Sequence, residues 1–162
     1  MADSTVFSYG ITLSGNGAVR LFPAAKVNFL NHKGEWFTLF LVVDSGANIS
    51  ALPKRDARTL GIAVEEGAPT IVASIGAETR GWQHTVDIRL KDEVLTIPLL
   101  FLDDDDAPRI LGRASIFERF TILFEETKRR TGFLGTGSQQ AQTTQGLLDE
   151  LSPLSVARAH AL

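Results

Sequence analysis

Asp44 is the residue of this sequence whose setting best fits catalysis. It follows an almost continuous apolar run, residues 36–43, and opens a turn of small residues, Ser45, Gly46 and Ala47. A buried strand ending here would carry the carboxylate to a turn whose backbone N–H groups can face it, and glycine would let a second backbone approach closely. The same residues could also form an ordinary turn at a strand end, because Asp, Ser and Gly all favour turns.

The composition of the rest of the chain argues against several other kinds of catalytic site. The chain of 162 residues has no cysteine, which excludes thiol nucleophiles, thiolate metal sites and disulfides. Its histidines (His32, His84 and His160) lie too far apart for an HExxH zinc helix, and we expect no metal and no cofactor. A phosphate-binding G-x-x-x-x-G-K-[ST] loop is absent, and phosphoaspartate chemistry would favour a second acid where Gly46 stands.

Three motifs, in order along the chain, resemble those of the retropepsin-like aspartic proteases. Residues 42–47 are similar to the family's hydrophobic-hydrophobic-Asp-[Ser/Thr]-Gly-Ala signature. Residues 110–113 (Ile-Leu-Gly-Arg) resemble its downstream hydrophobic-hydrophobic-Gly triplet, which is often followed by Arg. Between the two, residues 70–90 resemble the hairpin flap, with glycines near its tip. The resemblance covers residues 24–135.

The resemblance implies an aspartic endopeptidase in which Asp44 is catalytic. Hydrolysis of an amide by carboxylates needs two of them sharing one proton, one to accept a proton from water and one to hydrogen-bond to the scissile carbonyl. The chain contains a single Asp-Ser-Gly or Asp-Thr-Gly triplet, so the second Asp44 must come from a second copy in a two-fold symmetric homodimer.

Other residues take roles from the same resemblance. Support for the active-site loop would come from Ser45, Gly46, Ala47, Gly112 and Arg113, and the substrate-binding flap would contain Ile75, Gly76 and Ala77. A peptide or protein substrate would bind there as an added extended strand.

Two positions depart from the family's pattern. Members often carry an acid after the Asp-[Ser/Thr]-Gly-Ala signature and an acid or Asn after Gly-Arg, and these positions are Asn48 and Ala114 here. Arg113 could instead hydrogen-bond to Asn48 or to backbone carbonyls. The departures leave open a catalytically weak or inactive module that binds peptides or dimerises. A plain β-barrel interaction domain, with Asp44 as a turn residue, is a third alternative.

The elements that must position these motifs are mostly strands. We predict a mostly β, single-domain acid protease fold, a closed β-barrel or sandwich with a flap hairpin and one short C-terminal helix over residues 114–119. The apolar run at 36–43 predicts a strand buried on both faces. Further strands are predicted at 7–13, 18–22, 26–30, 70–75, 84–90, 94–102, 120–124 and 131–134, and a short helix at 53–60.

Composition also shifts along the chain. We predict a protease domain over residues 1–138, with residues 1–23 as an N-terminal extension hairpin that adds an edge or a dimer element. Residues 139–162 are predicted to be a linker, rich in Gln and Thr at its start, and a weakly helical or disordered tail, with any helix starting at residue 147.

Charge and hydropathy limit the partners. The net charge of −3 argues against a nucleic-acid partner, which would need a basic face. No apolar run approaches the ~20 residues of a membrane span, and no signal peptide is recognised, so we expect no membrane partner and a cytoplasmic location. The expected partners are a second copy of the chain and a peptide or protein substrate.

Overall fold

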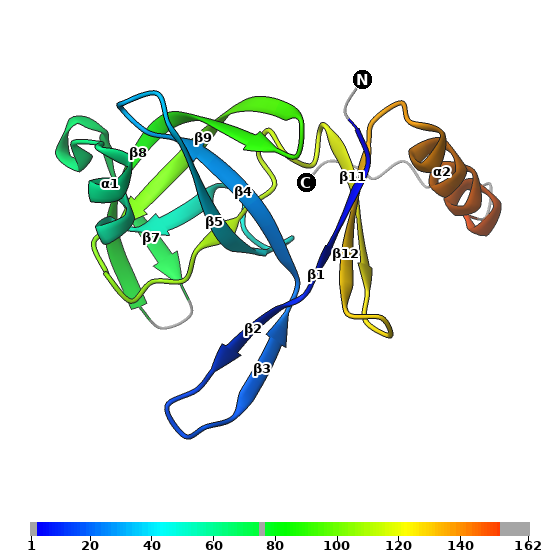
Figure 1. Cartoon of the computed structure of the whole chain (residues 1–162), viewed down its shortest axis with the longest axis horizontal. Coiled ribbons are helices and arrows are strands. Elements are labelled where there is room, and N and C mark those ends of the chain that lie inside the picture. Colours follow the sequence, from blue (N-terminus) through cyan, green and yellow to red (C-terminus); the bar gives the residue numbers. More distant parts are fainter. Residues whose placement is uncertain (1–2, 75–76, 153–162) are drawn as a thin grey trace, which may run out of the picture.

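The computed structural model describes residues 3–74 and 77–152, and strands dominate it, as predicted (Figure 1). The strands are β1 (Thr5–Ser8), β2 (Gly10–Leu13), β3 (Val19–Phe22), β4 (Ala24–Leu30), β5 (Trp36–Val43), β6 (Ser50–Pro53), β7 (Ala68–Ser74), β8 (Ala77–Leu90), β9 (Glu93–Leu102), β10 (Ile110–Leu111), β11 (Phe120–Glu125) and β12 (Arg130–Gly135). The helices are α1 (Lys54–Leu60), the 3-10 helix η1 (Val64–Glu66) and α2 (Gln139–Leu151).

Seven strands form the main sheet, in the order β4-β5-β10-β6-β9-β8-β7. An additional antiparallel pairing of β4 with β8, in which Asn28 faces Arg89 and Phe29 faces Ile88, closes this sheet into a ring. Closure pairs the free edge of β4, leaves β7 as an edge strand, and gives the sheet an inside and an outside.

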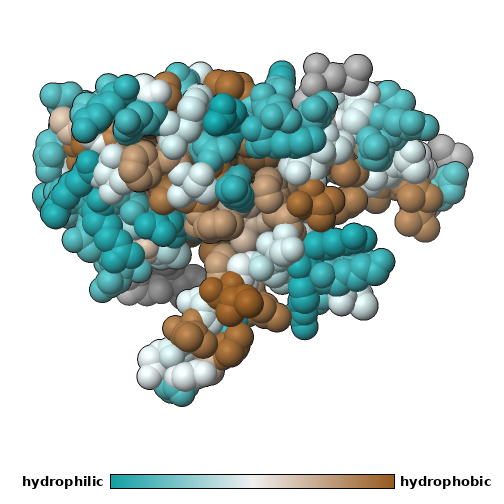
Figure 2. Space-filling model, viewed as in Figure 1, coloured by the Kyte–Doolittle hydropathy of each residue, from teal (hydrophilic) through white to brown (hydrophobic). Residues whose placement is uncertain are grey.

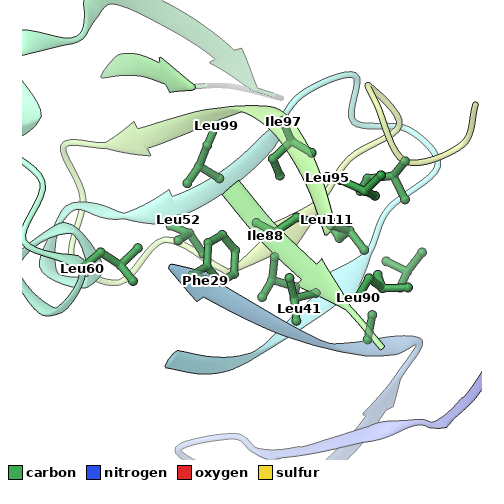
Figure 3. Packing of buried hydrophobic residues seen from close by; sticks show 14 of the residues in the cluster. Phe29, Leu41, Leu52, Leu60, Ile88, Leu90, Leu95, Ile97, Leu99 and Leu111 are labelled. Carbon is green, nitrogen blue, oxygen red and sulfur yellow. The ribbon is translucent and has the colours of Figure 1, made fainter. Parts of the chain in front are cut away.

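The core fills the inside of the ring (Figure 3). Strand β4 shows the cause, because Ala25 and Val27 are buried while Lys26 between them is exposed, in the two-residue period of a strand. Fully buried side chains from six strands meet there, namely Phe29, Leu41, Leu52, Ile88, Leu90, Ile97, Leu99 and Leu111. This packing fixes the ends of β5 and β10, which carry the motifs at residues 42–47 and 110–113.

Strand β5 is buried on one face only, so the prediction of two buried faces was wrong. Leu41 and Val43 point into the core, but Thr38 and Phe40 on the opposite face are exposed, Phe40 to 61%. A continuous apolar run requires two buried faces only where a second layer covers the sheet, and no described element covers the outside of β5 at these residues.

The N-terminal segment divides between two small sheets. The strand predicted over residues 7–13 breaks at Tyr9: β1 pairs with β12 in the sheet β1-β12-β11, and β2 pairs with β3 in a separate hairpin. Phe7, Phe133 and Phe120 stack edge to face, with ring centroids 5.4 and 5.8 Å apart, and join the three-stranded sheet to the core. The β2–β3 hairpin projects away from the rest of the molecule (Figure 1).

The helices agree with the sequence only in part. Helix α1 was predicted and ends at Gly61, whose φ of 69° is the left-handed conformation that glycine favours at a helix end. Residues 114–119 form turns rather than the predicted helix, because Ser115 takes a φ of 65°. Helix α2 begins within the segment predicted as a linker, where the Ser138 side chain accepts a hydrogen bond from the Ala141 N–H.

Within the described residues, no helix is both long enough and apolar enough to span a membrane.

Candidate active site

The strand pair β5 and β10 brings the two motifs together. The strands run parallel, with Leu111 opposite Val43, and β10 also pairs with β6 on its other side. The Asp44 N–H extends this ladder by donating to the Leu111 carbonyl at 3.1 Å. Residues 44–47 and 112–113, more than sixty positions apart in the sequence, therefore form adjacent loops at one end of the ring.

The first loop turns back on the Asp44 carboxylate. Its Oδ1 accepts a hydrogen bond from the Gly46 N–H at 2.8 Å, and the Asp44 carbonyl accepts one from the Ala47 N–H at 3.3 Å. Asp44 itself is half-buried, while Ser45 and Gly46 are exposed. The backbone thus orients the carboxylate, as the run of small residues predicted, and leaves it accessible to a ligand.

The second loop depends on Gly112. Its N–H donates to the hydroxyl of Ser50 at 3.0 Å, and a Cβ at this position would lie only 2.6 Å from the Ile49 carbonyl carbon. The next residues bind the first loop directly, because the Arg113 N–H donates to the Ala47 carbonyl at 3.0 Å. Ser50 is buried, 1% exposed, and was missed by the sequence reasoning; its only signal is a hydroxyl at the start of a short buried strand.

Arg113 contributes through its backbone. Its side chain is exposed and makes no hydrogen bond or ion pair with the described part of the chain, so the expected side-chain contact with Asn48 or a carbonyl is not formed. The Asn48 carbonyl instead accepts a hydrogen bond from the Ala114 N–H at 2.8 Å. Main-chain contacts therefore hold the two loops together where many relatives use an Arg–acid pair.

A half-buried ion pair, which the sequence reasoning also missed, supports the strand that leads into the second loop. Arg109 makes two hydrogen bonds to Asp56 of α1, at 2.6 and 2.8 Å, and the Asp56 side chain is only 7% exposed. The hydrogen bond to Asp56 raises the pKa of Arg109 above its ordinary value. The Arg109 carbonyl accepts from the Val42 N–H at 2.9 Å, so the pair fixes β10 against β5 just before both motifs.

A groove of about 870 Å³ opens beside the Asp44 carboxylate. Its lining comes from the first loop (Asp44, Gly46, Ala47, Asn48 and Ile49), from β7 (Val72 and Ala73), and from Leu100 and Ile110. Asp44 is the only acid among these lining residues, and the described chain holds no group of three His, Asp or Glu side chains that could bind a metal. The groove is mostly apolar, with one carboxylate at its floor.

The hairpin predicted as a flap is present as β7 and β8. These strands pair in an antiparallel register from Ala68 opposite Gln83 to Ser74 opposite Ala77. Of the three residues assigned to the flap, Ala77 begins β8, whereas Ile75 and Gly76 lie outside the described residues. Because β7 lines the groove, the hairpin is placed to bound a ligand, and its role as a flap stays a prediction.

The family follows from the sequence match. A sequence model of the family described as aspartyl protease matches residues 33–114, which is half of the chain and includes both loops, and the chain belongs to this family. No curated protein sequence is detectably similar to it.

Solved structures identify the fold. A retropepsin-like aspartic protease from Rickettsia conorii superposes with a TM-score of 0.57 and 18% sequence identity, over 82% of this chain and 99% of that chain. The EIAV protease in complex with the inhibitor HBY-793 gives a TM-score of 0.44 and 23% identity, over 57% of this chain and 82% of that chain. The match to the Rickettsia protein confirms the predicted mostly β, retropepsin-like fold.

Proposed function

We propose that this chain is an aspartic endopeptidase whose active site forms between two copies, each supplying one Asp44. The observation that carries the proposal is that Asp44 is the only acid lining a groove in a chain of the aspartyl protease family. One carboxylate cannot both activate water and donate a proton to the carbonyl, and the sequence contains no second Asp-Ser-Gly triplet. A two-fold symmetric dimer completes the pair with the fewest assumptions.

The chemistry divides between the two carboxylates. The ionised Asp44 accepts a proton from the attacking water, while the protonated Asp44 of the partner subunit hydrogen-bonds to the scissile carbonyl and later helps to protonate the leaving nitrogen. Two carboxylates within a few ångströms cannot both stay ionised, so the pair retains one proton, and we expect highest activity in mildly acid solution. The mechanism needs no metal and no cofactor.

The exposure of the first loop supports a shared site. Ser45 and Gly46 are exposed in the isolated chain although they adjoin the catalytic carboxylate. In the dimer, Ser45 would hydrogen-bond across the two-fold axis and Gly46 would leave room for the substrate backbone.

The groove supports a peptide or protein substrate. Ile49, Val72, Leu100 and Ile110 give it apolar walls. We expect an extended peptide with apolar side chains next to the scissile bond, covered by the β7–β8 hairpin, which would exclude water and bind the substrate main chain. A cytoplasmic location stays a prediction.

The direct test replaces Asp44 by asparagine, which keeps the size of the side chain and removes its charge. We expect Asp44→Asn to lower the rate of peptide cleavage at mildly acid pH by roughly 100-fold or more, the typical contribution of acid–base catalysis. Asp92→Asn, in the exposed turn between β8 and β9, is the matched control and should keep full activity. Cleavage at the normal rate by folded Asp44→Asn protein would refute the assignment.

Mixing the two kinds of chain tests whether the site is shared. If each site needs one Asp44 from each subunit, heterodimers of wild-type and Asp44→Asn chains are inactive. An excess of the variant should then lower the activity per wild-type chain well below that of wild-type protein alone. An unchanged activity per wild-type chain would exclude a shared site.

A second candidate function is a peptide-binding or dimerisation module with little or no catalysis. The exposed Arg113 side chain favours it, because the acids that many relatives place near this arginine are replaced by Asn48 and Ala114. This candidate predicts that apolar peptides bind the groove of the wild-type protein without being cleaved, and that Asp44→Asn leaves this binding unchanged.

A further inference from the structure

The β2–β3 hairpin, residues 10–22, carries a complete apolar face that the chain itself leaves uncovered; we call this hairpin the arm. Ile11 lies opposite Leu21 and Leu13 opposite Val19, so all four side chains share one face. They are 69%, 45%, 71% and 63% exposed, respectively. The other face carries Thr12 opposite Arg20. Figure 2 shows the hydrophobic residues gathered along this projection.

The arm is held in a fixed direction at its base. At one end the Tyr9 N–H donates to the Arg129 carbonyl at 2.8 Å, and at the other the Val43 N–H donates to the Pro23 carbonyl at 2.9 Å. The Phe22 ring occupies the space over Gly10, where a Cβ would lie 2.3 Å from a ring carbon. Because Val43 immediately precedes Asp44, the arm leaves the body of the chain next to the catalytic loop.

The three-stranded sheet offers a pocket of matching character. Val6, Gly132 and Leu123 lie in one row across β1, β12 and β11, and the central glycine leaves a gap between two exposed aliphatic side chains. The gap is the floor of a mainly apolar pocket of about 400 Å³, which Leu134 and Phe124 also line; we call it the sheet pocket.

Nothing within the described chain requires glycine at the floor of the sheet pocket. A Cβ on Gly132 would meet only Leu123, at an ordinary 3.6 Å from its Cβ and 3.9 Å from its carbonyl oxygen, and the backbone is not left-handed there. Gly132 itself is buried, but Val6 and Leu123 on either side of it are exposed, so the pocket between them is open to a side chain from another chain.

We propose that the arm of each protomer crosses to the partner and seats its apolar face in the partner's sheet pocket, so that two reciprocal contacts clasp the dimer that assembles the Asp44 pair. This inference rests on the proposed function, since the catalytic pair is what requires a second copy. A second copy is the favoured occupant because one chain supplies both complementary surfaces and covers neither. Two arm-to-pocket contacts related by a two-fold axis also give a closed dimer, because no arm or sheet pocket is left free to bind a third copy.

Cysteine cross-linking tests the contact directly, because the wild-type chain contains no cysteine. Chains with Leu13→Cys are mixed with chains carrying Leu123→Cys, the two being distinguished by a size tag, under mild oxidation. We expect a disulfide-linked heterodimer on a non-reducing gel. The control pairs Leu13→Cys with Val94→Cys, a position 56% exposed on β9, which should give no link. Equal linking in the control, or linking of Leu13→Cys chains only to each other, would overturn the arm-to-pocket contact.

Dimer affinity and complementation supply a second test. Leu13→Asp should raise the dimer dissociation constant roughly 100-fold, since two buried leucines are lost per dimer, whereas Val94→Asp should change it less than about threefold. Gly132→Leu, which fills the pocket, should weaken the dimer in the same way. A mixture of Leu13→Asp and Gly132→Leu chains regains one intact contact per heterodimer, so it should dimerise more tightly than either variant alone.

These outcomes separate the clasp from the catalytic proposal. Sedimentation and cross-linking do not depend on activity, so a clasped dimer that cleaves nothing would refute only the protease. Conversely, an active wild-type dimer whose affinity is unaffected by Leu13→Asp and by Gly132→Leu would refute only the clasp.

Discussion

The loops around Asp44 and the arm are neighbours in the fold, yet they are held in opposite ways. The loops are fixed by contacts within one chain: Gly112 packs on Ile49 and donates to the buried Ser50, and the Arg113 N–H donates to Ala47. The arm is fixed only at its base, and its four large apolar side chains remain exposed.

This difference separates two tasks. One chain can orient a carboxylate by itself, because the backbone ladders of β5, β6 and β10 and the Asp56–Arg109 pair determine where Asp44 lies. One chain cannot supply the second carboxylate. In the proposed dimer the surfaces left uncovered are those that the second copy contacts, so mutations in the two regions should affect different measurements: unfolding for the loops and dimerisation for the arm.

The largest loss of stability is expected from Arg109→Met, which leaves the Asp56 carboxylate buried without its partner. Unfolding should be easier by about 3 kcal/mol, the lower end of the usual cost of leaving one half of a buried pair, because the Arg109 side chain is itself 37% exposed. Chemical denaturation measures it. The control Arg55→Met removes a 3.9 Å contact to the fully exposed Asp106 and should cost no more than about 0.5 kcal/mol.

Removing both partners of the pair sharpens this result. In Arg109→Met combined with Asp56→Ala, no uncompensated charge stays buried, so the double variant should be more stable than Arg109→Met alone. If it is less stable by the sum of the two single effects, the pair does not act as a brace.

The next largest effect is expected at Gly112. Gly112→Ala places a methyl group 2.6 Å from the Ile49 carbonyl carbon, a backbone atom that cannot rotate away, and it should destabilise the fold by about 2–3 kcal/mol. Because the displaced loop carries the contacts to Ala47, peptide cleavage should fall as well. Gly132→Ala, with only ordinary contacts, is the matched control and should leave the thermal melting temperature nearly unchanged.

The sequence alone predicted Asp44 from a local pattern, an apolar strand followed by a turn of small residues, and Gly112 from the resemblance of residues 110–113 to a family motif. It could not locate the groups that hold them. Ser50 binds Gly112 across 62 positions, and Arg109 binds Asp56 across 53, and no periodicity or turn rule connects residues so far apart. Such pairs are created only when β10 takes its place between β5 and β6.

Three further predictions failed for local reasons. The apolar run of β5 would have the same composition whether one face or two were buried, so the sequence could not predict that Phe40 is exposed. The left-handed Ser115 replaced a predicted helix with turns. The Gln- and Thr-rich start of α2 has a composition typical of a linker, which was the prediction. Ser138 is nevertheless a suitable N-cap, and the helix starts directly after it.

Removing one serine hydroxyl should have a smaller effect on stability, and the effect should differ between the loops and the arm. Ser50→Ala leaves the Gly112 N–H buried without an acceptor and should cost about 1–2 kcal/mol of unfolding free energy. Ser14→Ala, at the exposed tip of the arm, also removes a hydrogen bond, to the Ala18 carbonyl, but water replaces it and the cost should stay within about 0.5 kcal/mol. Equal costs would mean that the loops are no better secured than the arm.

The smallest effect on folding is expected from Leu13→Asp. Its side chain is 71% exposed and lies outside the hydrophobic core. The unfolding free energy should therefore change by no more than about 0.5 kcal/mol when it is measured at concentrations where the chain is monomeric. Leu41→Ala, fully buried inside the ring, should cost about 2–5 kcal/mol in the same measurement. A leucine that is silent in folding but needed for dimerisation would belong to an interface, whereas a large loss of monomer stability from Leu13→Asp would mean that the arm packs on its own chain and that the clasp does not exist.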